Sequence, residues 1–213
     1  MSALAFAQQL VETLPVRAPD LFNPWRDACP EDLPGNGPQE KLQRLAAHLD
    51  CDPRFILCGE APGYQGCRHS GVAFTSERHL MDGVIPRIEP IRSRLTRRNP
   101  PYSEPSATIV WKALYQLGLA EDVVLWNALQ MHPFRRNNTR SNRTPTPAEI
   151  ALGRPALRLL VERFPKARVV AVGRKAADLL QDMGIAVEAT VRHPANGGAS
   201  LFTSGLADLV SAK

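Results

Sequence analysis

The sequence contains no long hydrophobic run, and no apolar stretch approaches the roughly 18 residues that a membrane span requires. Its first residues, MSALAFAQQLVETL, have no basic residue ahead of the apolar ones, so we expect no signal peptide. Charged residues make up only 22% of the 213 and hydrophobic residues 44%, which excludes a disordered chain and a histone-like polycation. We therefore expect a globular, cytoplasmic, monomeric protein without a membrane partner.

Metal-binding patterns are also missing from the sequence. The four cysteines form no CxxC pair, and the five histidines show no HxxxH spacing. A disulfide scaffold is not expected at this length, and nothing in the spacing indicates a zinc site. We predict no metal and no cofactor.

Alternating strands and helices dominate the rest of the chain. Four runs rich in branched residues predict strands: RFILCG from Arg54, DVVLWNA from Asp122, ARVVAVG from Ala167 and AVEATV from Ala186. Helical spacing covers residues 39–49, 108–117, 147–164, 175–183 and 201–209. The best local signal is Thr146-Pro-Ala-Glu149, a capping box that starts the helix at 147.

This alternation implies parallel strands joined by right-handed crossovers. We predict an α/β protein, a three-layer α/β/α sandwich with a short, mainly parallel four-stranded sheet, in one domain over residues 1–213. In such sheets ligands bind beyond the carboxyl ends of the strands. The glycine-rich segment from Gly59, Asn127 and His193 all follow predicted strands, so we expect them at one edge.

Several of these motifs resemble the uracil-DNA glycosylase superfamily. GEAPG from Gly59 resembles the first motif of the iron–sulfur branch, family four, and His193-Pro194 resembles the start of the second. NRTPTPAEI from Asn142 is similar to that branch's strand-to-helix connection, whereas QGCRHSGVAFTSE resembles the family-five loop. The similarity spans roughly residues 54 to 200, and the order of several motifs makes it more specific than any one motif.

The resemblance implies a monofunctional glycosylase that hydrolyses the bond between uracil, or another deaminated base, and DNA. Such an enzyme holds a flipped base in a pocket. The amide of Asn127 can donate to uracil O4 and accept from N3–H. Phe74 lies where the family stacks an aromatic ring on the base. His193 is placed to donate to the O2 atom, where negative charge develops. Further base-binding positions implied by the first motif are Gly59, Ala61, Pro62, Gly63 and Tyr64.

Departures from the family are equally informative. Met131 and Gly153 stand where family four has two of its cluster cysteines, so we expect no iron–sulfur centre. Ala61 stands where many relatives have an Asp or Asn that orients water. Glu60 and Glu77 are the nearby carboxylates, and the sequence does not decide between them, although Glu60 directly follows the strand.

DNA is the partner that the resemblance implies. The basic loop after the second strand and the small residues after His193 are the predicted contacts: Arg135, Arg136, Arg140, Arg143, Asn196 and Gly197. Because of Ala61 and the small HPANGG loop, an alternative hypothesis is that the protein is a relative of these enzymes that binds nucleic acid without cleaving it. A small-molecule hydrolase on a Rossmann-like sheet is the third reading. The sequence decides neither the preferred base nor single- against double-stranded DNA.

Overall fold

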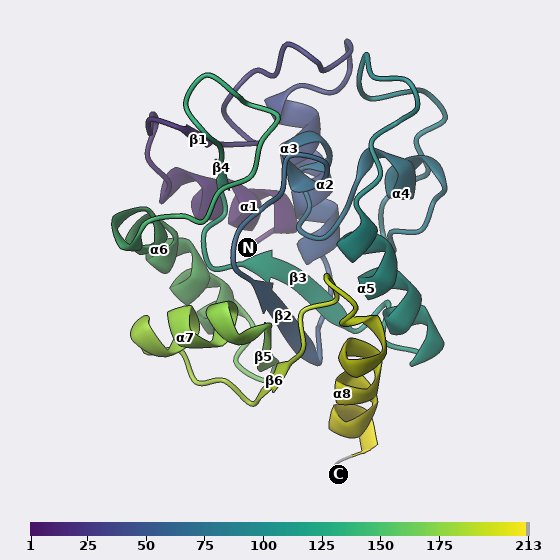
Figure 1. Cartoon of the computed structure of the whole chain (residues 1–213), viewed down its shortest axis with the longest axis vertical. Helices are drawn as coiled ribbons and strands as arrows, with labels where there is room; N and C mark the ends of the chain where they lie inside the picture. The colour runs from purple at the N-terminus through teal and green to yellow at the C-terminus, as the bar shows by residue number, and fades with distance from the viewer. Residues whose placement is uncertain (212–213) are drawn as a thin grey trace.

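A computed structural model describes residues 1–211 of the chain. Its centre is a parallel four-stranded sheet in the order β3-β2-β5-β6 (Figure 1). The strands are β2 (Phe55–Gly59), β3 (Val123–Asn127), β5 (Arg168–Val172) and β6 (Ala189–Val191). Each lies within one of the four predicted runs, so the predicted sheet is confirmed.

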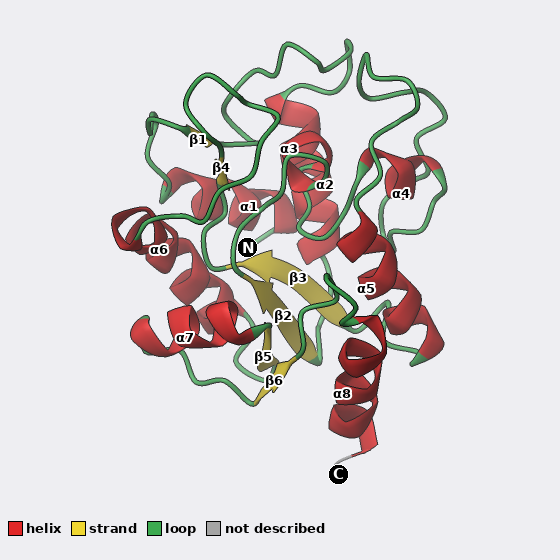
Figure 2. Ribbon diagram, viewed as in Figure 1, coloured by secondary structure: helices red, strands yellow, loops and turns green. Residues whose placement is uncertain are grey.

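Helices cover both faces of this sheet (Figure 2). Alternate strand residues point to opposite faces, so Ile56 and Cys58 join one buried cluster while Phe55 and Leu57 join the other. The first cluster packs under α1 (Ala3–Glu12), α2 (Pro38–Leu49), α6 (Pro147–Arg163) and α7 (Arg174–Asp182). The second packs under α4 (Glu77–Met81), α5 (Pro105–Gln116) and α8 (Ala199–Ser211). The predicted three-layer α/β/α sandwich is confirmed.

Local sequence signals located the main helices well. At the start of α6 the Glu149 N–H donates to Thr146 Oγ1 at 3.3 Å, and the Thr146 N–H donates to the Glu149 carboxylate at 2.8 Å. This is the predicted capping box. The pattern did not predict α1, α4, the one-turn α3 (Cys67–Ser70) or the two-residue strands β1 (Leu21–Phe22) and β4 (His132–Pro133), which pair antiparallel. Among the described helices, none is long and apolar enough to cross a membrane.

A buried histidine forms a hydrogen bond with the backbone of β3, which is an edge strand of the sheet. The Leu125 N–H, which no neighbouring strand can satisfy, donates to Nε2 of His48 on α2 at 2.9 Å. Burial lowers the pKa of His48 to about 3, so the ring stays neutral and can accept this bond. The contact fixes α2 beside the sheet and thereby the loop that follows β2.

Candidate active site

A cavity of about 640 Å³ lies at the carboxyl edge of the sheet. Its wall combines the loop after β2, the end of β3, the loop before α6 and the segments after β5 and β6. Nine of the predicted site residues line it: Glu60, Ala61, Pro62, Gly63, Phe74, Asn127, Arg143, His193 and Asn196. The volume is within the range of small-ligand sites. The parallel topology thus brings distant motifs together.

One wall of the cavity is formed by an aromatic ring and an amide that meet over a glycine. A Cβ atom at Gly59 would lie 2.6 Å from Cζ of Phe74 and 2.8 Å from Oδ1 of Asn127. Any larger residue at position 59 would force these two side chains apart. Gly59 is therefore required so that the ring and the amide can share one wall.

Asn127 is a nearly buried residue whose amide lines the cavity. The residue is only 5% exposed, and within residues 1–211 its side chain has no partner, although its backbone oxygen accepts from Gln130 Nε2 at 2.7 Å. Buried amides in folded proteins nearly always have partners. Because this one faces the cavity, its donor and its acceptor are both available to a bound molecule.

Phe74 is held in a strained backbone conformation. Its φ of 49° lies in the left-handed region, which costs about 1 to 3 kcal/mol for such a residue. The surrounding loop holds this conformation, because Trp111 Nε1 donates to the Phe74 carbonyl at 2.9 Å and Ser70 Oγ donates to the Thr75 carbonyl at 2.7 Å. The ring is therefore fixed in place before any ligand arrives.

His193 is oriented by its own loop. The Ala195 N–H donates to Nδ1 of His193 at 3.1 Å, so Nδ1 is the acceptor and the proton of the neutral ring is on Nε2. Burial and the neighbouring Arg192 both lower the pKa of His193, which favours this neutral form. The ring, which lines the cavity, has an Nε2–H donor that no hydrogen bond within residues 1–211 occupies.

Comparison with known proteins now decides the family. The model of the Uracil DNA glycosylase superfamily matches residues 46–206, which is most of the chain. This chain belongs to the uracil DNA glycosylase superfamily. Members of the superfamily are glycosylase hydrolases that act on damaged DNA. No curated protein matches the chain.

Solved structures agree on the fold. The crystal structure of Pedobacter heparinus SMUG2 superposes with a TM-score of 0.69, covering 100% of this chain and 98% of that one. The two sequences are only 14% identical, so the likeness concerns the fold and leaves the chemistry to the residues of this site.

The iron–sulfur cluster of the superfamily's family four does not fit this chain. Gly153 of α6 packs so closely on the Ala128 carbonyl that any Cβ would overlap it, which leaves no room for a cysteine. The other expected ligand position is occupied by buried Met131. The structure therefore supplies no thiolate at either place, and we assign no role to a cluster.

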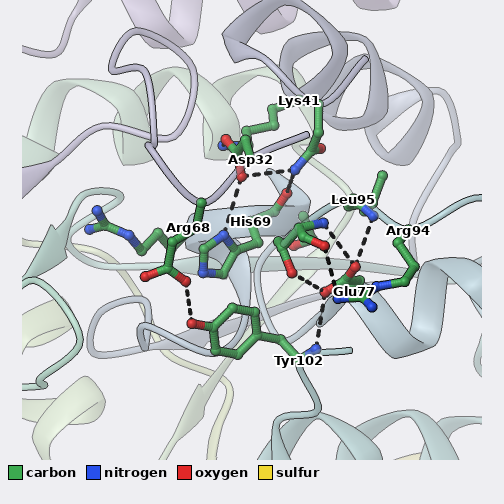
Figure 3. Close-up of polar contacts among 12 residues, drawn as sticks. Asp32, Lys41, Arg68, His69, Glu77, Arg94, Leu95 and Tyr102 are labelled. Carbon is green, nitrogen blue, oxygen red and sulfur yellow. Dashed lines mark hydrogen bonds and ion pairs between the residues drawn. The ribbon is translucent and has the colours of Figure 1, made fainter. Parts of the chain in front are cut away.

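Glu77 lies outside the cavity and is fully occupied. Its carboxylate accepts four hydrogen bonds: from the N–H groups of Leu95 at 2.8 Å, Thr96 at 3.0 Å and Tyr102 at 3.0 Å, and from Thr96 Oγ1 at 2.7 Å (Figure 3). Glu77 is completely buried. It fixes the segment between α4 and α5, and a carboxylate so saturated has no lone pair for a water molecule, so we do not retain it as a candidate base.

Glu60 does line the cavity, but it has a cationic partner. Its Oε1 atom lies 3.6 Å from Nζ of Lys175, which in turn donates to Thr144 Oγ1 at 3.1 Å. The glutamate side chain is 28% exposed. The ion pair joins the loop after β2 to the start of α7 and closes one side of the cavity.

Tyr64 differs from the other residues of the first motif because its ring turns away from the cavity. The ring packs edge-on against Tyr102, with centroids 6.2 Å apart. Its backbone N–H donates to Oδ1 of Asn142 at 2.9 Å. Asn142, which belongs to the motif before α6 but was not predicted as a site residue, therefore connects the loop before α6 to the glycine-rich loop and lines the cavity itself.

The predicted arginines are of two kinds. Arg143 lines the cavity, but its guanidinium donates to both oxygens of Glu149, at 2.6 and 2.7 Å. Arg143 thereby stabilises the first turn of α6. Arg136 and Arg140 are 78% and 70% exposed and form surface ion pairs with Asp20 and Glu31. Such pairs contribute little and exchange readily. Arg135 is also exposed.

Several residues of the cavity were not among those predicted from the sequence. Arg174, Lys175 and Arg192 line it directly after β5 and β6, and the signal that could have identified them is their position behind strand ends. Glu104, the residue before α5, also lines it, although no motif of the sequence contains it.

One further cluster has the residue types of a metal site. Donor atoms of Cys29, Asp32 and His69 lie within 4.8 Å of one another. Asp32 is already paired with the fully buried Lys41, with 2.5 Å between Nζ and Oδ2, and a second cation there would be repelled (Figure 3). His69 also stacks on Tyr102 at 4.4 Å. The cluster joins the segment before α2 to α3 and does not line the cavity.

Proposed function

We propose that this chain hydrolyses the N-glycosidic bond of uracil, or of another deaminated base, flipped out of DNA. The observation that carries the proposal is the amide of Asn127, which has no hydrogen-bond partner among residues 1–211 and lines the cavity beside the ring of Phe74. A planar base with alternating donors and acceptors would satisfy the amide and stack on the ring. Uracil offers O4 to the amide NH₂ and N3–H to its oxygen.

The chemistry proposed for His193 follows from its tautomer. As the bond to the sugar breaks, negative charge develops on O2 of the departing base, and the sugar becomes oxocarbenium-like. A fixed N–H donor stabilises this charge more in the transition state than in the ground state. The Nε2–H of His193 is such a donor, because the Ala195 N–H holds the other nitrogen. Water is the nucleophile.

DNA would approach along the cationic rim of the cavity. Arg174, Lys175 and Arg192 are exposed there, and the basic loop with Arg136 and Arg140 lies beyond Arg143. Side chains of this kind contact phosphates. We further propose that the protein is cytoplasmic, acts as a monomer and forms a single domain.

A single-uracil oligonucleotide tests the proposal. The strand is incubated with the protein, single-stranded or paired with guanine, and then heated in alkali, which breaks it at an abasic site. Breakage supports the glycosylase. Binding without breakage supports the alternative that Ala61 motivates, a relative that recognises a base without cleaving it. The absence of both breakage and binding favours a small-molecule hydrolase. A panel of deaminated bases then defines the substrate.

A further inference from the structure

Among residues 1–211, Glu104 is the one carboxylate of the cavity that has neither a hydrogen-bond nor an ion-pair partner, and it is half-buried. It is the N-cap residue of α5, yet its side chain caps no amide of that helix. Short side chains are favoured at this position because they reach back to the first amides. Glu104 instead extends its carboxylate to the glycine-rich loop after β2 and into the cavity wall. Within residues 1–211 this carboxylate accepts no hydrogen bond.

Two glycines of the loop after β2 make room for it. A Cβ at Gly66 would overlap the Glu104 carboxylate, and a Cβ at Gly63 would lie 3.1 Å from its Oε1 atom. The loop therefore fits closely around the carboxylate without satisfying it. A merely structural glutamate would be expected to have hydrogen-bond partners of the kind that Glu77 has.

The position of Glu104 matches the place of the reacting sugar. Asn127 and Phe74 form the wall of the cavity against which the base would lie. Glu104 also lines the adjoining groove under the loop after His193, together with Asn196 and Gly197. A nucleotide with its base against that wall and its phosphates in the groove has its C1′ atom between the two. Glu104 lies at that junction.

We propose that Glu104 is the general base of the hydrolysis, an inference that rests on the proposed function. A water molecule held by its carboxylate attacks C1′ while the glycosidic bond breaks, and the electron pair of that bond leaves with the base. His193 stabilises the resulting anion. The proton of the water passes to Glu104, which later releases it to solvent while the free base takes up a proton. The products are the free base and DNA with an abasic site.

The electrostatic surroundings suit this role. Burial alone raises the pKa of Glu104 to about 7, near the value at which a general base works best at neutral pH. Glu104 interacts with the Cys67 thiol on α3, and burial raises the pKa of that thiol. The other charged groups of the cavity are paired with other residues or exposed on its rim: Glu60, Arg143, Arg174, Lys175 and Arg192.

The test is single-turnover release of uracil from a single-stranded oligonucleotide between pH 5 and 9. Glu104→Gln is compared with the wild type, with Glu104→Asp and with Glu60→Gln. Glu162→Gln, which removes an exposed charge on α6, is the matched control. Affinity is measured on the same strand with 2′-fluorinated deoxyuridine, which resists cleavage because fluorine destabilises the oxocarbenium ion. Circular dichroism verifies that each variant is folded.

We expect Glu104→Gln to slow release about 100-fold or more with little change in affinity, and Glu104→Asp to recover part of the rate. The wild-type rate should fall as the pH drops through about 7, and this dependence should vanish in Glu104→Gln. A folded Glu104→Gln variant with the wild-type rate and pH profile overturns the assignment and leaves the proposed function standing. A large loss in Glu60→Gln alone moves the role to Glu60. A wild-type protein that releases no base overturns both proposals.

Discussion

Replacing Glu104 with glutamine is expected to stabilise the folded protein at alkaline pH and to leave its stability unchanged at acidic pH. The folded-state pKa of about 7 lies above the ordinary value of 4.5. A carboxyl group whose pKa is raised on folding favours the folded state only while it is protonated. Its contribution is complete below pH 4.5 and is lost as the pH rises through 7.

The size of the effect follows from that difference. One pKa unit corresponds to about 1.4 kcal/mol, so the full difference would amount to about 3 kcal/mol at pH 8. Glu104 faces an open cavity, and solvent screens part of its charge, so we expect about 1 to 2 kcal/mol. For a protein of this length, 1 kcal/mol shifts Tm by about 2 to 4 °C. Glu104→Gln should therefore raise Tm by several degrees at pH 8.

Thermal unfolding of the wild type and Glu104→Gln at pH 5 and pH 8 measures this. Glutamine has the shape of the protonated carboxyl group, so the two proteins should unfold together at pH 5 and separate at pH 8. Glu162→Gln, which lies on the surface, should show no such pattern. An equal Tm for both proteins at pH 8, or an equal gain at both pH values, refutes the reasoning that the half-buried carboxylate has no partner and is partly desolvated.

The remaining predictions concern the other walls of the cavity. His193→Ala should lower single-turnover base release about 100-fold or more, with affinity for DNA nearly unchanged in a filter-binding assay, because its donor acts in the transition state. Asn127→Asp should abolish release of uracil, since a carboxylate lacks the NH₂ that O4 requires; a wild-type rate would show that another residue recognises the base. Gly59→Ala should remove base release in a protein that still folds, because its methyl group displaces both Phe74 and Asn127; crystallography or tryptophan fluorescence checks the fold. Purified protein should be colourless and free of iron by elemental analysis.

The sheet and the main helices were predictable because their signals are local. The strand runs around Phe55 and Val123 are entirely buried, and such continuous apolar runs are typical of parallel strands. Thr146 and Glu149 fix the start of α6 within four residues of sequence. The carboxyl ends of parallel strands share one edge, so the convergence of Asn127, His193 and the loop after Gly59 followed from the topology alone.

Roles within loops were not predictable in the same way. Glu77 and Glu104 are both glutamates at the starts of short or medium helices, and no local pattern distinguishes them. The difference is set by distant backbone: amides of residues 95, 96 and 102 surround Glu77, whereas glycines 63 and 66 surround Glu104. The motif that resembles a known loop therefore identified Glu77 as a candidate base but could not predict the backbone amides that occupy its carboxylate. The direction of a loop side chain depends on contacts that only the fold provides.

The features that distinguish the cavity all destabilise the protein without a ligand. Within residues 1–211, Asn127 has an amide without a partner in a residue that is only 5% exposed, Phe74 adopts a strained backbone angle, and Glu104 has a half-buried carboxylate without a partner. Unpaired buried groups and strained residues each cost about 1 to 3 kcal/mol, which a folding domain retains only where the surrounding core offsets them. Substitutions that relieve these costs should stabilise the chain and lower its activity together, whereas a cavity of purely structural origin would show no such correlation.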